Sequence, residues 1–223
     1  MAVRFTTDFH YTDRTSKARY VWLKYGEILR GSRILDVGAD ECHLKEHLDP
    51  SATYWGVGKG GNPDQEVDLE SGELPFADGS YDCVLCLDVL EHLENAHFIF
   101  DELCRVARRH LVVSFPNPWA VFWHMLRARD YRPRQPLKFY GLPPERPPDR
   151  HRWFFSQREA REFIEHRAAN RGMQILQMDN ESDVPPRLDW KKRWAMSILL
   201  RPDVDVESLY VGPLWAVLEK PSA

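Results

Sequence analysis

The chain has 223 residues, 43% of them hydrophobic and 29% charged, a composition typical of a globular protein with one substantial core. A formal net charge of -4 argues against a nucleic-acid partner, and the sequence lacks the run of about 20 apolar residues that a membrane span needs. The start, MAVRFTTDFH, has no apolar stretch typical of a secretory signal, so we expect a cytoplasmic protein. The simplest interpretation is a single domain over residues 1–223, with insertions near 118–152 and 180–208.

The first half of the chain alternates apolar runs with helical patterns. Strands are predicted at RILDV (33–37), TYWGVG (53–58), QEVDLE (65–70), YDCVLCL (81–87) and HLVVSFPNP (110–118). A short helix is predicted over Glu41–Leu48, and apolar residues at helical spacing predict another over Ile99–Val106. The nearly continuous apolar run 81–87 is typical of a strand that is covered on both faces of a sheet.

Two of the four cysteines form a C-x-x-C pattern, which marks some zinc and redox sites. Here Cys83 and Cys86 fall inside a predicted strand, where residues three apart point to opposite faces. The sequence has no second C-x-x-C and no histidine pair at ligand spacing. We therefore predict that the cysteines are buried in the core, and no metal site is expected.

The second half of the chain contains a segment in which the periodicity lapses. Residues 118–152 are rich in proline and aromatic residues, and their basic residues include Arg127, Arg129, Arg132, Arg134 and Lys138. A segment of this kind is more often functional than a plain linker, and we expect it to form a lid at the acceptor site. Beyond it, Ser156 and Glu159 form a capping box that begins a helix ending at Gly172. Strands follow at 173–179 and 209–220, and the whole order predicts a mainly parallel sheet with helices on both faces.

Polar groups and glycines gather where the predicted strands end. They are Asp36-Val37-Gly38, Gly58, Asp68-Leu69 and Asp88. The carboxyl ends of parallel strands meet at one edge of a sheet, which is where ligands bind in such folds. A dinucleotide is disfavoured, because Asp40 and Glu41 would face its pyrophosphate at a cost of several kcal/mol. No phosphate-binding G-x-x-x-x-G-K-[ST] pattern is present either.

Three segments, ILDVGADECHL (34–44), VDLESGELPFADGSYDCVLCLDVLEHLEN (67–95) and LVVSFPNP (111–118), resemble the class I S-adenosylmethionine (SAM)-dependent methyltransferases, and in particular the small-molecule group called type 11. A weaker similarity to MetW-type methyltransferases continues through SFPNPW and HRWFFSQREAREFI. The resemblance implies an α/β, Rossmann-like three-layer sandwich whose mainly parallel seven-stranded sheet has an antiparallel closing strand. It also implies SAM as cofactor, S-adenosylhomocysteine as product, and a small-molecule or sugar-containing acceptor methylated at oxygen or nitrogen.

The same resemblance implies roles for individual residues. Asp36 and Gly38 would form the turn under the methionine part of SAM, Asp68 and Leu69 would contact the adenine, and Leu87 and Asp88 would lie near the sulfonium. The chain departs from the family pattern at Asp40 and Cys42, which replace two glycines, and at Gly58, which replaces the acid that holds the ribose. Asp40 is expected to pair with the ammonium of the ligand, and Asp64 or Glu66 to recover part of the ribose contact.

Two histidines are the candidate catalytic bases, since methyl transfer to a hydroxyl requires removal of a proton. His92 follows the fourth strand end, and His151 follows the proline-rich segment. Both are equally compatible with structural roles, and His43 is more typical of a solvated neighbour of the turn. The departures at Asp40 and Gly58 also leave open a catalytically silent domain that serves as a binding or scaffolding partner. A membrane-associated enzyme acting on lipid-linked sugars is a third possibility, and the sequence does not indicate the oligomeric state.

Overall fold

The structure, a computed structural model, describes residues 4–127, 139–141, 144–147, 149–181, 194, 196, 198 and 205–221. Its strands are β1 (Arg33–Val37), β2 (Thr53–Gly58), β3 (Gln65–Glu66), β4 (Tyr81–Leu87), β5 (Ala107–Phe115), β6 (Gln174–Asn180) and β7 (Leu214–Glu219). Its α-helices are α1 (Arg14–Leu29), α2 (Ala96–Val106), α3 (Pro118–Arg127) and α4 (Gln157–Asn170). Short 3-10 helices are η1 (His43–His47), η2 (Leu90–His92) and η3 (Glu207–Leu209).

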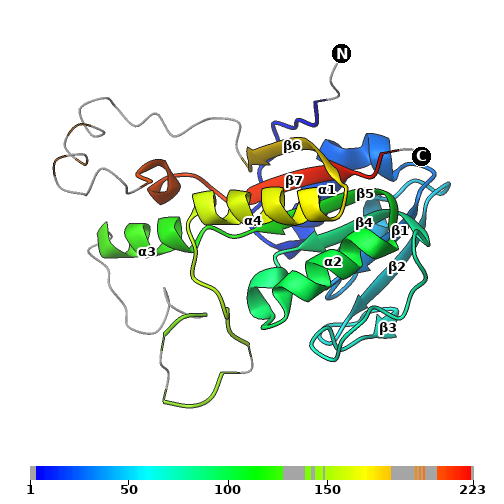
Figure 1. Ribbon diagram of the computed structural model, residues 1–223, viewed down its shortest axis with the longest axis horizontal. Coiled ribbons are helices and arrows are strands. Elements are labelled where there is room, and N and C mark those ends of the chain that lie inside the picture. The colour runs from blue at the N-terminus through cyan, green and yellow to red at the C-terminus, as the bar shows by residue number, and fades with distance from the viewer. Residues whose placement is uncertain are drawn as a thin grey trace.

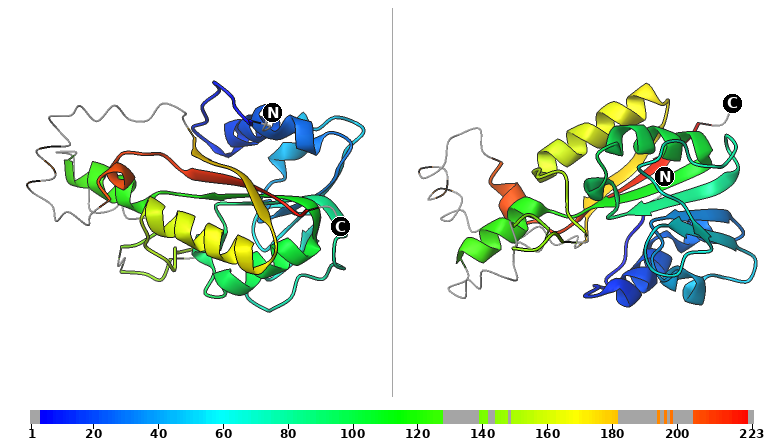
Figure 2. Two further views of the ribbon diagram at one scale, coloured as in Figure 1. Left: turned by 45° about the horizontal axis from the view of Figure 1, so that its top comes forward. Right: turned by 90° about the horizontal axis from the view of Figure 1, so that it is seen from below.

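The strands form one seven-stranded sheet in the order β3-β2-β1-β4-β5-β7-β6 (Figure 1). Neighbouring strands are parallel except at β7, which runs antiparallel to both β5 and β6. Helices α2 and α4 cover one face of the sheet and α1 lies on the other, so the domain has three layers (Figure 2). The predicted Rossmann-like sandwich with an antiparallel closing strand is confirmed. The strand order reverses between β1 and β4, so their carboxyl ends form the crevice in which such folds bind ligands.

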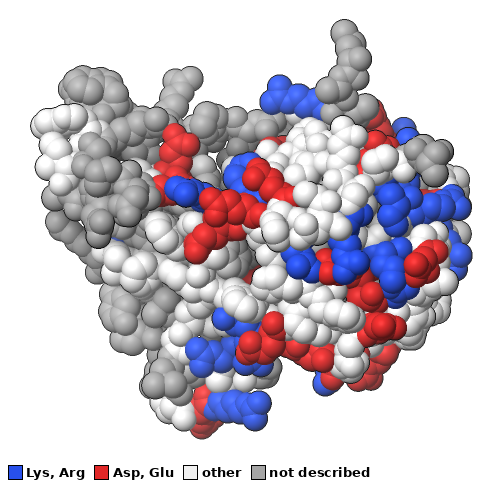
Figure 3. All heavy atoms as spheres, in the orientation of Figure 1, with Lys and Arg blue, Asp and Glu red and all other residues white. Residues whose placement is uncertain are grey.

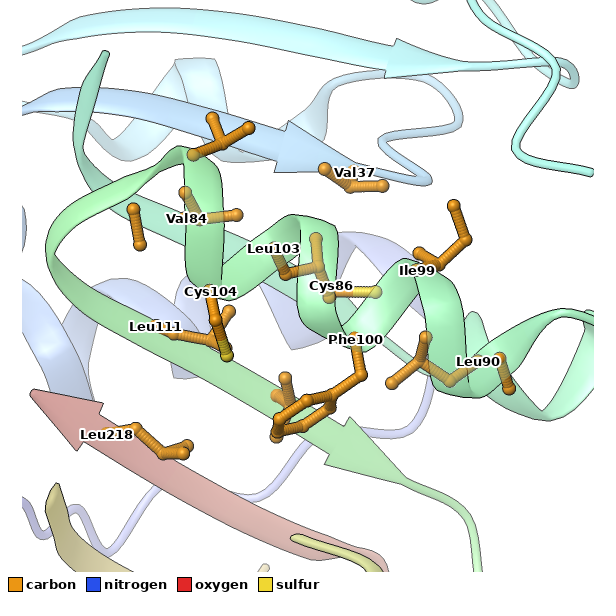
Figure 4. Close-up of a cluster of buried hydrophobic side chains, with 14 of the residues drawn as sticks. Val37, Val84, Cys86, Leu90, Ile99, Phe100, Leu103, Cys104, Leu111 and Leu218 are labelled. Atoms are coloured by element: carbon orange, nitrogen blue, oxygen red, sulfur yellow. The ribbon is translucent and has the colours of Figure 1, made fainter. Parts of the chain in front are cut away.

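The apolar side chains of the sheet form one cluster on each face. Cys83 belongs to the cluster under α1 and Cys86 to the cluster under α2, because alternate residues of β4 point to opposite faces. Figure 4 shows Cys86 packed among side chains of α2, including Ile99 and Leu103. All four cysteines are free and buried, as the sequence predicted.

Several elements differ from the prediction in extent. Strand β3 has two residues instead of the six predicted over 65–70, and β5 begins directly after α2 ends at Val106. Residues 118–127, where we predicted no regular element, form α3. Pro118 suits the first helical turn, and the side chain of Asn117 accepts a hydrogen bond from Ala120 N at 3.1 Å.

The capping box of Ser156 and Glu159 is present and begins α4, as predicted. Of the basic residues in the proline-rich segment, Arg127 ends α3, whereas Arg129, Arg132, Arg134 and Lys138 lie outside the described residues. Most of the second insertion, 180–208, also lies outside them.

The two edge strands of the sheet differ in how they are covered. On one side, β3 is only two residues long. On the other, the N-terminal segment lies against β6, where Gln177 accepts a hydrogen bond from Phe5 N at 2.8 Å and donates one to Phe5 O at 2.7 Å. The ring of Phe5 is buried against Tyr25 of α1, which fixes this segment to the domain.

The charged side chains do not segregate on the face that Figure 3 displays. Among the described residues there, lysines and arginines are interspersed with aspartates and glutamates. None of the helices within the described residues has both the length and the apolar character to cross a bilayer.

One buried ion pair joins α1 to the edge strand β6. Lys24 Nζ donates to both carboxylate oxygens of Asp179 at 2.8 Å and to the Tyr20 hydroxyl at 3.0 Å. We expect Lys24→Ala to lower the free energy of unfolding by about 3 kcal/mol, because it leaves a largely buried carboxylate without its cation. Denaturant unfolding of the variant and of Arg158→Ala, which breaks an exposed pair with Glu162, measures this. Arg158→Ala, the control, should lower the free energy of unfolding by less than about 1 kcal/mol. Equal decreases in the two variants would contradict the prediction.

Candidate functional site

A cavity of about 330 Å³ opens at the carboxyl ends of β1 and β4. Its lining comes from α1, the turn after β1, the end of β4, η2 and the segment near 139–151. The predicted site residues that line it are Asp36, Gly38, Asp40, Leu87, Asp88, His92 and His151. The fold therefore brings most of the predicted residues together, whereas Gly58, Asp68 and Leu69 are not among the described residues of this lining.

The turn after β1 requires glycine at its first position. Gly38 has φ +83°, and a Cβ there would collide with the side chain of Val89. The amides of Gly38 and Ala39 both donate to Val57 O, at 2.7 and 3.1 Å, which holds the turn against β2. The chain therefore passes close to the end of β4, where the cavity begins.

The two residues that replace glycines in this turn have structural partners. Asp40 and Cys42 both adopt the left-handed backbone conformation, with φ +50° and +55°. Asp40 was expected to pair with the ammonium group of a ligand. In the structure it already forms an ion pair with Arg14 of α1. Cys42 is buried against Gly56, where a Cβ would collide with its sulfur. The departures from the family pattern are thus compatible with an ordered turn.

Asp36, the last acid of β1, is buried below the turn. The Tyr54 hydroxyl donates to its Oδ2 at 2.7 Å. Burial raises the pKa of Asp36 to about 6, although the hydrogen bond from Tyr54 and the charge of Lys17 act in the opposite direction. A positive group entering the cavity would favour the charged form of this carboxyl.

Asp88 is the most constrained acid of the cavity. It has φ +57°, which is uncommon for a residue other than glycine and is a feature found at functional sites. Its two oxygens bind Lys17 Nζ of α1 at 2.7 Å and the Ser114 hydroxyl of β5 at 2.6 Å. Burial raises the pKa of Asp88, but Lys17 and Ser114 outweigh this and hold the pKa below its ordinary value. Lys17 lies near the start of α1.

The edge of the sheet at which the ribose and adenine would lie is open. Gly58 does not have a positive φ, and a Cβ there would make ordinary contacts, the nearest being Gly38 Cα at 3.5 Å. Asp64 binds Lys45 and accepts from Gly56 N at 2.8 Å, so it is held away from the role proposed for it. Asp68 is 44% exposed and pairs with Lys59 at 2.8 Å. The carbonyl of Leu69 accepts from the Asn95 side chain at 2.9 Å.

The two candidate bases meet on the other side of the cavity. The ring centroids of His92 and His151 are 4.4 Å apart. Asp149 lies 2.6 Å from His92 Nδ1, and the Tyr140 hydroxyl lies 2.8 Å from His151 Nδ1. Burial, followed by the neighbouring His92, lowers the pKa of His151 to about 4, so its imidazole is neutral at pH 7.

Glu91 is a site residue that sequence reasoning missed. Its side chain is 1% exposed, and neither carboxylate oxygen has a hydrogen-bond partner among the described residues. Its Oε1 lies 3.8 Å from His92 Nε2 and 4.0 Å from His151 Nε2. Burial raises its pKa well above the ordinary value. The sequence predicted no cluster of metal-ligand type, but the fold forms one here because it returns His151 to Glu91 and His92 from a distant part of the chain.

The comparison with protein families gives one match. Residues 46–113 match the family described as a methyltransferase domain. This region holds β2 to β4, α2 and most of β5, and it confirms the resemblance inferred from the sequence. No curated protein matches the chain.

Solved structures resemble the chain at low identity. One belongs to a complex between the Haloferax volcanii Trm112 methyltransferase activator and a methyltransferase (TM-score 0.52, 15% identity, 94% of this chain and 95% of that chain). Another is the [4+2]-cyclase SpnF (TM-score 0.55, 14% identity, 99% and 87%). A third is the magnesium protoporphyrin IX methyltransferase of Synechocystis PCC 6803 with bound S-adenosylhomocysteine (TM-score 0.50, 16% identity, 95% and 90%). At these identities the similarity establishes the fold.

The buried carboxyl of Asp36 gives the stability a pH dependence that can be measured. Because its pKa rises from 3.8 to about 6 on folding, the folded protein holds this proton more tightly, and the associated stability is lost as pH rises from about 4 to about 6. Relative to Asp36→Asn, the free energy of unfolding of the wild type should fall by about 2–3 kcal/mol between pH 3.5 and pH 7, since one pKa unit equals about 1.36 kcal/mol.

Denaturant unfolding of both proteins at several pH values checks this expectation. Tyr54→Phe should enlarge the pH dependence, because it removes the donor that favours the charged carboxylate. Parallel stability curves for wild type and Asp36→Asn would show that the acid titrates equally in the folded and unfolded chains.

Proposed function

We propose that this chain transfers the methyl group of SAM to an oxygen or nitrogen atom of a small-molecule or sugar-containing acceptor. S-adenosylhomocysteine would be the second product. The proposal starts from the SAM-dependent methyltransferase domain of the class I fold that the chain carries. The observation that carries this proposal is the composition of the cavity. Its lining combines the acidic residues Asp36, Asp40 and Asp88 with two adjacent imidazoles, His92 and His151. A cationic methyl donor and a proton-bearing acceptor need these two environments next to each other.

The residues on the acidic side fit the methionine part of the cofactor. Asp36, Gly38, Asp40, Leu87 and Asp88 would hold it, and their carboxylates suit its ammonium and sulfonium charges as they would not suit a pyrophosphate. Arg14 and Lys17 also line the cavity, where they are paired with Asp40 and Asp88, and either would have to exchange that partner to bind the carboxylate of the cofactor. Bound SAM supplies a methyl group that is activated by a positively charged sulfur.

The residues of the open sheet edge would hold the adenosine part. Asp68 and the backbone of Leu69 are proposed to contact the adenine, and Gly58 provides space beside the ribose. Asp68 must exchange its exposed partner Lys59 for the ligand, which is inexpensive because exposed ion pairs contribute little.

The two histidines would act on the acceptor. In the proposed tautomer, Asp149 accepts a hydrogen bond from the Nδ1–H group of His92, which leaves Nε2 free to take a proton, as in other His–carboxylate pairs. In the transfer, an acceptor lone pair forms the bond to the methyl carbon, the carbon–sulfur bond breaks with its electrons left on sulfur, and the acceptor proton passes to His92. Neutral His151 orients the acceptor beside it.

A catalytically silent binding domain is the second candidate. This candidate is favoured because position 58 is a glycine instead of an acid. It is also favoured because Asp40 and Asp68 are already paired with Arg14 and Lys59. The similarity of the fold to that of a [4+2]-cyclase also cautions that this fold supports other chemistries. Cofactor binding separates the two candidates.

Cofactor binding should improve when the missing acid is supplied. We expect SAM to bind the wild type with a dissociation constant weaker than about 10 μM, and Gly58→Asp to tighten binding about tenfold or more through hydrogen bonds to the ribose hydroxyls. The φ of Gly58 and its ordinary Cβ contacts make the substitution sterically acceptable. Titration calorimetry with SAM and S-adenosylhomocysteine measures both constants.

The matched control is Gly60→Asp, which adds the same charge to the same loop where a Cβ meets no atom within 4 Å. The affinity of Gly60→Asp for SAM should stay within about threefold of the wild-type value. If millimolar cofactor gives neither heat nor a thermal shift with the wild type, the silent-domain candidate is favoured instead.

Proton removal should depend on His92. With methyl-labelled SAM and a small-molecule extract as the source of acceptors, the wild type should transfer label to an extractable product. His92→Gln should lower that rate at least 100-fold, the usual size of a general-base contribution, while cofactor affinity changes less than threefold. His166→Gln, on the exposed surface of α4, serves as control. Full activity of His92→Gln would exclude it as the base.

A further inference from the structure

Three side chains with metal-ligand chemistry converge on the acceptor side of the cavity. One ligand atom each of Glu91, His92 and His151 lies within 4.8 Å of the others. Both histidine Nε2 atoms face the same carboxylate oxygen, Glu91 Oε1, at 3.8 and 4.0 Å. A cation bound about 2.0–2.2 Å from each of these atoms would fit between them after small side-chain movements.

We propose that Glu91, His92 and His151 bind one divalent transition-metal cation, such as Zn²⁺ or Mn²⁺, that leaves open coordination positions toward the cavity. Two histidines and one carboxylate are the ligand set of many catalytic metal sites with open positions. The binding itself needs only these residues. Its role in orienting the acceptor rests on the proposed function.

The far nitrogen of each histidine already has the partner that a metal-binding imidazole requires. His92 Nδ1 contacts the Asp149 carboxylate at 2.6 Å, and His151 Nδ1 contacts the Tyr140 hydroxyl at 2.8 Å. The Asp149 carboxylate can only accept, so the Nδ1 proton of His92 points to it and Nε2 carries the free lone pair. The Tyr140 hydroxyl can accept from His151 Nδ1 in the same way, and in that tautomer both Nε2 atoms can bind a cation at once.

Glu91 is the observation that distinguishes this cluster from a chance group of polar residues. A buried carboxyl group without a hydrogen-bond partner is rare, and a position for an ion is one explanation of it. The basic residues of the cavity are already engaged, since Lys17 binds Asp88 and Arg14 binds Asp40. Among the described residues, no donor contacts the Glu91 carboxyl group, and Lys17, whose charge acts on it, is bound to Asp88.

The cluster is also held in place by the backbone. Arg152 N donates to Glu91 O at 2.7 Å, and the Trp153 indole donates to Leu93 O at 2.7 Å. These bonds fasten the segment that carries His151 onto η2, which carries the other two ligands. A prearranged set of ligands lowers the cost of binding a metal ion.

The identity of the ligands predicts both the metal and the acceptor. Imidazole nitrogens suit Zn²⁺, Mn²⁺ or Co²⁺, whereas Mg²⁺ prefers oxygen ligands. With open positions toward the cavity, the cation would favour an acceptor with two neighbouring oxygen donors, such as vicinal hydroxyls. The lone pair of His92 Nε2 cannot bind a metal and accept a proton at the same moment, so in the metal-loaded protein the cation, rather than free His92, would activate the acceptor.

Metal titration of the full chain tests the proposal. Protein without an affinity tag, treated with chelator and dialysed, is titrated with Co²⁺ by visible absorption and with Zn²⁺, Mn²⁺ and Mg²⁺ by calorimetry. We expect one Co²⁺ or Zn²⁺ per chain with a dissociation constant of about 10 μM or tighter, and Mg²⁺ at least 30-fold weaker. Glu91→Gln and His151→Gln should each weaken Zn²⁺ binding at least 30-fold. His43→Gln, which changes another histidine of the same cavity, should alter it less than threefold.

Each outcome bears on the proposal. Circular dichroism identifies variants that fold, and if Glu91→Gln does not fold, His151→Gln and the Co²⁺ spectrum of the wild type remain as tests. Absence of stoichiometric binding, or equal loss in His43→Gln, would overturn the metal site. SAM titrated into the chelator-treated protein keeps the two proposals apart. Cofactor binding without metal binding would overturn only the metal site, and metal binding without cofactor binding would overturn only the proposed function.

Discussion

The ion pair between Lys17 and Asp88 links the three parts of the molecule that surround the cavity. Lys17 belongs to α1, Asp88 directly follows β4, and the Ser114 hydroxyl of β5 completes the network. The pair fixes α1 over the point at which the strand order reverses, and the backbone of Asp88 takes a left-handed conformation to reach it. That conformation costs of order 1 kcal/mol. The contacts of Asp88 with Lys17 and Ser114 offset this cost, and they also determine where a ligand can enter.

The fold was predictable because its signals are local. The run 81–87 had to be a strand covered on both faces, and the opposite orientations of Cys83 and Cys86 followed from strand geometry alone. The capping box of Ser156 likewise marks the start of α4 without reference to the rest of the chain. Helix α3 escaped prediction because its apolar residues lie in a proline-rich context, in which Pro118 begins a helix instead of preventing one.

The site was predictable only in part, because its contacts are distant in sequence. Residues at strand ends could be assigned to one edge of the sheet, and five of those assigned to the cofactor do line the cavity. The pairing of Asp40 with Arg14 could not be read from the sequence, since it depends on where α1 packs. Glu91 was overlooked for the same reason. Its significance comes from being buried next to His151, and sequence spacing carries no information about that contact.

The edges of the sheet affect how copies of this protein behave at high concentration. An exposed edge strand can recruit a strand from another molecule and begin aggregation. Here β3 is too short to act as a template, and the N-terminal segment lies along β6, where the side-chain amide of Gln177 binds both the amide and the carbonyl of Phe5. The short β3 therefore opposes sheet extension at one end, and at the other end the contacts of Phe5 with Gln177 attach the N-terminal segment to the strand that forms the edge.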